Sequence, residues 1–278
     1  MSTKTPYNQE SIDKIKADIR QLEQQPLEGL EQPKALAKAY VKLSDEYKKI
    51  GTLTTLAQAV AAGTQAIHYA EELPLEVDEY RDVLASAYIV LGDPQWKLGT
   101  PTDLQQALAS YKQALQLRKA LPLDNHEYRN NLATAYRKYG NAQWNLGTPS
   151  DLQQAIESYN QAIKLSQDLP LDNPEYRNDL AWAYNNRGNA QRNLGTPSDL
   201  QQAIDLYNQA IKLLQELPLD NPEYRNDLAN AYMNRGYAQS DLGTPSDLQQ
   251  AIESYNQAIK FGQELPLDNP EYYIHSLI

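Results

Sequence analysis

The fold of this chain is decided by the stretch Gly147–Leu194, which reads GTPSDLQQAIESYNQAIKLSQDLPLDNPEYRNDLAWAYNNRGNAQRNL. The same pattern returns along the chain with a period of 48 residues. The tripeptide Leu-Gly-Thr marks this period and begins at Leu98, Leu146, Leu194 and Leu242. A fixed period of this size indicates one supersecondary unit stacked on copies of itself. The function must therefore lie on a surface that the stacking creates.

The start of the stretch predicts a helix. Gly147 stands where a left-handed residue would end the preceding helix. Thr148 is placed to cap the new helix, with Pro149 at its first position and Asp151 three residues after the cap. Apolar residues then recur at helical spacing to about residue 168, where Leu-Pro-Leu at 169–171 breaks the pattern.

A second helix is predicted to begin at Asn173-Pro174-Glu175 and to run to about Asn193. Two helices of roughly 20 residues joined by short turns form an antiparallel hairpin. We therefore predict an all-α fold, a right-handed superhelical solenoid of antiparallel helix hairpins with about five full repeats plus terminal helices.

We count each repeat from the helix that follows the Leu-Pro-Leu turn, which we call the first helix of the repeat. A capping helix is expected within residues 1–28, and a partial first helix of a further repeat at 269–278. The five repeats are predicted at 29–76, 77–124, 125–172, 173–220 and 221–268. Either the natural chain continues past Ile278, or this short segment caps the last repeat by itself.

Composition excludes several classes of function. The chain has no cysteine, and its three histidines share no helix face, so we predict no metal site, no cofactor and no enzymatic activity. The formal net charge of −11 disfavours a nucleic-acid partner. No long apolar run and no apolar segment in the first nine residues are present, so we predict a cytoplasmic protein with no membrane span.

The order of aromatic and small residues in the repeats resembles that of the tetratricopeptide repeat (TPR) family. The matching residues in one copy are Tyr184, Gly188, Gly195, Ala203, Tyr207, Ala210 and Pro218. The repeat here is longer than the usual unit of about 34 residues, and in this it is similar to the extended repeats of kinesin light chains. The resemblance implies that the first helices line a concave groove that binds a protein or peptide partner. Arg187 and Arg235 depart from the family pattern, which has a buried leucine there.

Neighbouring copies differ mainly on one face of the first helix. The copies that start at Gly147 and Gly195 differ at nine of 48 positions. Five of these differences share a helix face: Trp182/Asn230, Asn185/Met233, Asn189/Tyr237, Arg192/Ser240 and Asn193/Asp241. A face that varies on a constant scaffold favours recognition, and neutral drift of an exposed face is the alternative.

The chemistry of this face suggests how a partner would be held. Asparagine is a poor helix former, so its repetition there suggests a use. A carboxamide can pair both groups of a peptide backbone, and aromatic residues can act as anchors. We call the resulting set of candidate groove residues the Asn/Trp face: Asn130, Arg137, Asn141, Trp144, Asn178, Trp182, Asn185, Asn186, Asn189, Arg192, Asn226, Asn230, Met233, Asn234 and Tyr237. Packing of the tryptophans between neighbouring first helices is the structural alternative.

Capture of a terminal carboxylate by a two-carboxylate clamp, known in the TPR family, fits less well. Arg137, Asn141 and Asn186 match its first part, but Asn230 and Asn234 stand where the second basic pair is needed. We therefore favour a scaffold that binds an extended peptide or flexible segment. The alternative is a structural module that docks to another copy or to a downstream domain through its apolar C-terminal end. A third hypothesis, binding of single-stranded RNA, is disfavoured by the negative net charge and the lack of a basic stripe.

One local feature predicts a distortion. Pro94 falls inside the first helix of the second repeat, where it removes a backbone hydrogen bond and should bend or widen that helix. Gly63 also stands where later repeats carry a tyrosine, so the first repeat must fill its core differently.

Overall fold

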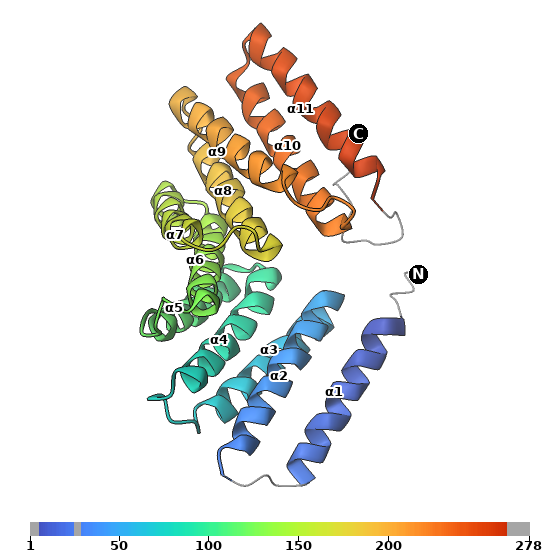
Figure 1. Ribbon diagram of the computed structural model, residues 1–278, viewed down its shortest axis with the longest axis vertical. Coiled ribbons are helices and arrows are strands. Elements are labelled where there is room, and N and C mark those ends of the chain that lie inside the picture. The colour runs from blue at the N-terminus through green and yellow to red at the C-terminus, as the bar shows by residue number, and fades with distance from the viewer. Residues whose placement is uncertain (1–5, 25–28, 266–278) are drawn as a thin grey trace. The chain divides into compact units, whose positions relative to one another are not determined.

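A computed structural model describes residues 6–24 and 29–265 of the 278-residue chain (Figure 1). The described residues are almost entirely helical and contain no strand. Their helices are α1 (Pro6–Gln24), α2 (Glu31–Ile50), α3 (Leu53–Ala70), α4 (Asp78–Leu98), α5 (Pro101–Lys119), α6 (His126–Leu146), α7 (Pro149–Gln167), α8 (Pro174–Leu194), α9 (Pro197–Gln215), α10 (Pro222–Leu242) and α11 (Pro245–Gln263). The partial helix expected at 269–278 lies outside the described residues.

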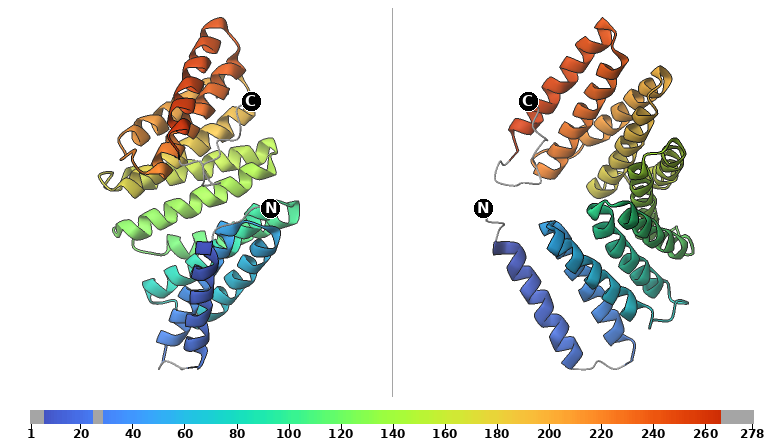
Figure 2. Two further views of the ribbon diagram at one scale, coloured as in Figure 1. Left: turned by 90° about the vertical axis from the view of Figure 1, so that its right-hand side faces the viewer. Right: turned by 180° about the vertical axis from the view of Figure 1, so that it is seen from behind.

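The chain forms two compact units, residues 1–146 and 147–278. We call α2, α4, α6, α8 and α10 the A helices and α3, α5, α7, α9 and α11 the B helices. In the first unit α3 packs between α2 and α4, and α5 packs between α4 and α6. In the second unit α9 packs in the same way between α8 and α10, and Figure 2 shows these antiparallel pairs from two further sides. The predicted all-α class of stacked helix hairpins is confirmed.

The ends of the helices follow the local signals in the sequence. Thr196 accepts a hydrogen bond from the backbone N–H of Asp199 at 3.2 Å, and Pro197 occupies the first turn of α9. Asn221 caps α10 by accepting from the N–H of Glu223 at 2.9 Å. Gly195 ends α8 with φ +79°, a left-handed conformation that glycine adopts without steric cost. The predicted boundaries of 168 and 193 in the quoted stretch are each within one residue of the observed helix ends.

Within a hairpin, an A-helix glycine receives the ring of a B-helix tyrosine. Tyr207 is fully buried, and a Cβ atom added at Gly188 would lie only 2.6 Å from its ring. The same relation joins Gly92 with Tyr111 and Gly236 with Tyr255. The absence of a side chain on the A helix is therefore what allows an aromatic ring to fill the space between the paired helices.

In the first hairpin the glycine is on the B helix, and the A helix carries the larger residue of the pair. Gly63 of α3 occupies the tyrosine position, and Ser44 of α2 occupies the glycine position. A Cβ atom at Gly63 would lie 2.9 Å from the Cα atom of Leu91 in α4. The backbone of α4 therefore approaches α3 in the space that a tyrosine would otherwise fill. This close approach is how the first repeat fills its core without the tyrosine.

Ser44 also compensates for the proline in α4. The helix runs unbroken from Asp78 to Leu98 although Pro94 cannot donate to the carbonyl of Val90, four residues earlier. The buried hydroxyl of Ser44 lies 3.0 Å from this carbonyl oxygen and 2.9 Å from that of Ala59. A hydroxyl has one proton, and only the Val90 carbonyl lacks its helical donor. Ser44 thus supplies from another helix the hydrogen bond that Pro94 removes.

This arrangement predicts the outcome of a double-mutant cycle. Ser44→Ala should lower the free energy of unfolding by about 1–3 kcal/mol, because it leaves the buried Val90 carbonyl without a donor. The same change in a Pro94→Ala background should cost clearly less, since alanine in place of the proline restores the helical N–H. Urea denaturation of the four proteins, followed by circular dichroism, measures the coupling. Equal costs in both backgrounds would show that Ser44 does not serve this carbonyl.

Helix α1 covers the exposed side of the first hairpin. Its buried Ile12 and Ile19 pack in one cluster with Leu36, Leu43 and Tyr47 of α2. The predicted capping helix is thus an amphipathic helix that buries an isoleucine stripe. Within the described residues, no helix is both long enough and apolar enough to cross a membrane.

Candidate functional site

The A helices contact each other directly within each unit. α2 contacts α4, α4 contacts α6, and α8 contacts α10, whereas successive B helices within a unit approach each other less. The A helices, which carry the Asn/Trp face, are therefore the helices that approach their own kind most closely within each unit.

In the second unit, several residues of the Asn/Trp face join α8 to α10. Asn234 Nδ2 donates to Asn185 Oδ1 at 3.2 Å. Arg192 Nε donates to the Asp241 carboxylate at 2.9 Å, and its guanidinium lies 5.1 Å from the centre of the Tyr237 ring. These bonds form a polar ladder between neighbouring A helices, which the sequence analysis did not foresee.

Two further asparagines of this face are bonded to the scaffold. Asn178 Nδ2 donates to Asp227 Oδ2 at 3.1 Å, and Asn178 is only 5% exposed. Asn189 Oδ1 accepts a hydrogen bond of 2.8 Å from the hydroxyl of Tyr207. Asn178 is therefore too buried to meet a bound peptide, and its prediction as a groove residue is corrected on this ground. Asn189 is half-buried and also positions the core tyrosine.

The rest of the Asn/Trp face is partly accessible. Met233 packs beside the buried core of α9 and α10. The half-buried members are Asn130, Arg137, Asn141, Trp144, Trp182, Asn185, Asn186, Asn189, Arg192, Asn226, Asn230, Met233, Asn234 and Tyr237. The first four belong to α6 in the first unit and the others to α8 and α10 in the second. The structure thus places the set on A helices, with each unit carrying its own portion.

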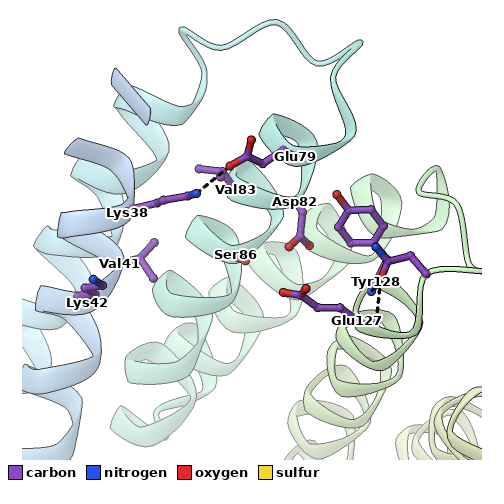
Figure 3. A pocket seen from close by; sticks show the side chains of 10 residues that line it. Lys38, Val41, Lys42, Glu79, Asp82, Val83, Ser86, Glu127 and Tyr128 are labelled. Atoms are coloured by element: carbon purple, nitrogen blue, oxygen red, sulfur yellow. Dashed lines mark hydrogen bonds and ion pairs between the residues drawn. The ribbon is translucent and has the colours of Figure 1, made fainter. Parts of the chain in front are cut away.

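In the first unit, a cavity of about 470 Å³ lies over the middle of α2 and the beginnings of α4 and α6. Figure 3 shows Lys38 reaching Glu79, with Asp82 and Tyr128 beside the space. Lys38 Nζ lies 2.9 Å from the Glu79 carboxylate, and Lys34 Nζ lies 3.0 Å from it. Hydrogen bonds and the charges of these lysines hold the pKa of Glu79 below its usual value. Both signs of charge therefore line this first cavity.

Asp82 at the cavity wall anchors a buried arginine. Arg118 of α5 is 5% exposed, and its Nε atom donates to Asp82 Oδ1 at 3.1 Å. The same guanidinium donates to the backbone oxygen of Asn131 at 2.9 Å and to the Ser86 hydroxyl at 3.0 Å. Asn131 Nδ2 in turn donates to Asp82 Oδ2 at 3.2 Å. This network joins α4, α5 and α6 beneath the cavity.

A second cavity, of about 250 Å³, lies toward the C-terminal ends of the same three A helices. Its floor contains Asp93, whose carboxylate lies 2.7 Å from Lys48 Nζ and 2.8 Å from Lys138 Nζ. Tyr111 of α5 donates to Asp93 Oδ1 at 2.9 Å. Burial by itself would raise the pKa of Asp93, but the charges of Lys138 and Lys48 outweigh burial and hold it well below its usual value.

Sequence reasoning missed these charged centres, although a signal was present. Asp93 stands at the repeat position that is asparagine at Asn141 and Asn189, and the first repeat also carries a carboxylate there, Asp45. A carboxylate at a position that is asparagine in later repeats needs a partner, and Lys48 and Lys138 lie 45 residues before and after Asp93.

The structure also accounts for Arg235, one of the two departures from the family pattern. Its Nε atom donates to the Ser254 hydroxyl at 3.0 Å, and its Nη1 atom donates to Asn208 Oδ1 at 2.8 Å. The guanidinium also lies 5.0 Å from the centre of the Tyr232 ring. Arg235 thus bridges the B helices α9 and α11 from the A helix between them.

Comparison with known proteins identifies the fold and no family. No family model matches the chain, and no curated protein matches it. The crystal structure of BtubC (BKLC) from P. vanneervenii superposes with a TM-score of 0.71 at 19% identity, covering 93% of this chain and 91% of that one. The crystal structure of MamA protein gives a TM-score of 0.48 at 19% identity, covering 87% and 98%. The likeness to BtubC, together with the helix pairs described above, shows that the chain has a TPR-like helical-repeat fold.

Proposed function

We propose that this chain is a non-enzymatic protein-interaction scaffold of the extended TPR type, which binds an extended segment of a partner along its A-helix faces. The observation that carries the proposal is that the first unit has two cavities on the face formed by α2, α4 and α6. They lie toward opposite ends of the same helices. An extended segment that runs along this face would meet both.

The side chains there suit recognition of a peptide backbone. Each carboxamide has two donor hydrogens and an acceptor oxygen, so one bond to the scaffold does not exhaust it. Each neutral hydrogen bond contributes only about 0.5–1.5 kcal/mol net, so several are needed. Trp144 on α6 is half-buried and supplies apolar contact area for a side-chain anchor. A sum of roughly 8 kcal/mol corresponds to micromolar binding.

A random-peptide display on the immobilised intact chain tests this proposal. Enriched peptides should bind in solution, and Asn141→Ala combined with Trp144→Ala should weaken their binding by about tenfold or more, as expected for the loss of an anchor. Fluorescence anisotropy of labelled peptides measures the affinity, and circular dichroism verifies unchanged helicity.

The matched control changes exposed residues of the B helices. Gln153→Ala combined with Gln201→Ala removes two polar side chains from α7 and α9, and peptide binding should stay at the wild-type level. Failure to enrich any peptide, or equal losses in both double variants, would refute peptide binding on the A-helix face.

A second candidate function is assembly through the last hairpin. Ile252 of α11 is 53% exposed, whereas the equivalent Ile204 of α9 is covered by α10 and only 7% exposed. Leu248 and Ile259 extend the same exposed apolar stripe on α11. A stripe that an A helix buries in the preceding repeat offers a surface for an A helix of another copy.

Light scattering across a range of protein concentrations tests assembly. The intact chain should associate as its concentration rises, and Ile252→Glu should keep it monomeric, because a charge cannot be buried in an apolar contact without cost. Gln257→Glu adds the same charge at an exposed position of α11 and should leave association unchanged. A wild-type chain that stays monomeric at all concentrations would exclude this candidate.

A further inference from the structure

Helix α1 packs on α2 at the repeat positions of a B helix (Figure 1). Its isoleucines Ile12 and Ile19 precede Ile252 and Ile259 of α11 by 240 residues, which is five repeat periods of 48. Ile12 is 1% exposed and Ile19 is 5% exposed, because both pack in one cluster with residues of α2. α1 therefore buries against α2 the same two positions that α11 carries.

The face of α2 that receives α1 matches the face of α10 that receives α9. Three residues of α10 pack in one cluster with Ile211 of α9: Leu228, Ala231 and Tyr232. At the same repeat positions, α2 carries the same three residue types: Leu36, Ala39 and Tyr40. These three pack in the cluster that contains Ile12 and Ile19. The α2 face is thus that of an A helix that accepts a B helix.

A hydrogen bond confirms this register of α1 on α2. Gln215 of α9 donates to the hydroxyl of Tyr232 at 2.8 Å, across 17 residues of sequence. The hydroxyl of Tyr40 donates to Glu23 of α1 at 3.3 Å, again across 17 residues. Glu23 stands at the repeat position of Gln263, which is exposed near the end of α11. α1 therefore gives Tyr40 the partner that a glutamine of a B helix gives Tyr232.

On its other side, α1 does not resemble a B helix. Ser11 and Asp18 stand where α11 carries the alanines Ala251 and Ala258. Both alanines are buried, and Ala258 packs in the cluster that contains the core residues of α10. Asp18 is exposed. α1 can therefore pack against an A helix on one side only, as a capping element of a repeat stack does.

Helix α11 leaves open the two positions that α1 buries. Ile252 is 53% exposed and Ile259 is 40% exposed, whereas α10 reduces the exposure of the equivalent Ile204 and Ile211 of α9 to 7% and 4%. The contact that α11 lacks is thus the α9–α10 contact one repeat later. One chain carries both halves of such a contact, because α11 supplies the B-helix side and α2 supplies the A-helix side.

We propose that α11 of one copy docks on α2 of a second copy in the place of α1, so that the helix stack continues from chain to chain. This inference rests on the second candidate function, assembly through the last hairpin, and names the surface that receives α11. Ile259 packs on Leu36 of the second copy, and Gln263 donates to its Tyr40. Because the two joined surfaces differ, the contact is head-to-tail and can repeat. α1 holds the same face of α2, so it competes with docking and limits assembly.

Detaching α1 should therefore strengthen association. Ile12→Asp combined with Ile19→Asp places two charges against α2, where they cannot be buried without cost. The apparent dissociation constant, measured by analytical ultracentrifugation of the intact chain, should fall about tenfold or more, because a face that is covered most of the time binds with reduced apparent affinity. Ile12→Ala combined with Ile19→Ala should change it in the same direction without added charge.

The matched control places the same two charges on the exposed side of α1. Ala17→Asp combined with Gln21→Asp should leave the dissociation constant at the wild-type value, because both residues are exposed. Circular dichroism verifies that each variant keeps its helices apart from α1.

A mixture of two chains tests which surfaces meet. The triple variant Ile12→Asp, Ile19→Asp, Ile252→Glu has an open α2 and a blocked α11, so it should be monomeric alone. With the wild-type chain, which offers α11, it should form an equimolar complex in size-exclusion chromatography with light scattering. Replacing the wild-type chain by Ile252→Glu should abolish the complex, and replacing it by Gln257→Glu, with the same charge at an exposed position, should not.

The results that would overturn the proposal also separate it from the candidate function on which it rests. Association that requires Ile252 but is unchanged by Ile12→Asp with Ile19→Asp would exclude docking on α2 and leave assembly through the last hairpin standing. Self-association of the triple variant would show that the opened α2 face does not select α11. Chains that stay monomeric in every variant and mixture would exclude both, as expected if residues 266–278 or another protein cover the α11 stripe.

Discussion

Tyr207→Ala is expected to lower the free energy of unfolding by about 3–5 kcal/mol, the loss typical of deleting a buried aromatic side chain. Tyr207 is 0% exposed, and its ring lies against Gly188 of the paired helix. Alanine would leave a cavity between α8 and α9 that neither helix can close, because both are also packed against other helices. The hydroxyl bond to Asn189 would be lost as well.

The repeats supply the controls for this variant. Tyr207→Phe keeps the ring and removes only the hydroxyl, so it should cost about 1 kcal/mol. Tyr255 occupies the same repeat position in the last hairpin but is half-buried, so Tyr255→Ala should cost clearly less than Tyr207→Ala. Urea denaturation of the intact chain, followed by circular dichroism, compares the three. Equal losses of unfolding free energy in Tyr207→Ala and Tyr255→Ala would show that coverage by the following A helix adds nothing to the stability that the tyrosine provides.

Asp82→Ala is expected to destabilise the first unit by about 3–5 kcal/mol, the cost of leaving a buried charge without its partner. Arg118 would keep its bonds to the Asn131 carbonyl and the Ser86 hydroxyl, but its positive charge would be uncompensated at 5% exposure. Asn131 would also lose its acceptor on α4. The penalty therefore comes mainly from the arginine that remains and not from the carboxylate that is removed.

A double variant distinguishes this explanation from loss of a favourable contact. Asp82→Leu combined with Arg118→Met replaces the pair with apolar side chains and should recover most of the stability, because apolar replacements of buried ion pairs are often neutral or stabilising. Glu79→Ala, one turn earlier on α4, breaks the ion pairs with Lys34 and Lys38 at an exposed site and should cost at most about 1 kcal/mol. A double variant as unstable as Asp82→Ala would show that the pair itself contributes the stability.

The conflict between Pro94 and its helix shows where local reasoning stops. Proline inside a helix removes a backbone hydrogen bond, and from this alone we predict a bend or local widening of α4 at Pro94. The structure keeps α4 continuous and places the hydroxyl of Ser44 beside the orphaned carbonyl of Val90. Ser44 is 46 residues from Val90 in sequence, so no local pattern could have identified this compensation.

The amino-acid sequence by itself determined the repeat, the helix boundaries and the caps of this protein. Glycine in the left-handed region, threonine or asparagine before a proline, and a break at Leu-Pro-Leu all act within a few residues, so each signal can be read where it stands. The assignment of the Asn/Trp face to A helices followed from helical periodicity for the same reason.

Only the tertiary structure decided which polar side chains hold the scaffold together. The bonds Asn178–Asp227, Asn185–Asn234 and Arg192–Asp241 each join residues 49 apart, and Lys48 meets Asp93 over 45. Because these residues are about one repeat apart, the sequence allows each pair to lie on neighbouring A helices. Whether the two side chains meet depends on how closely those two helices approach each other. That distance is set by the buried residues between them, including glycines such as Gly188 that admit a ring. Hydrogen bonds weaken within a fraction of an ångström, so the packing of the core selects among the pairs that the repeat allows.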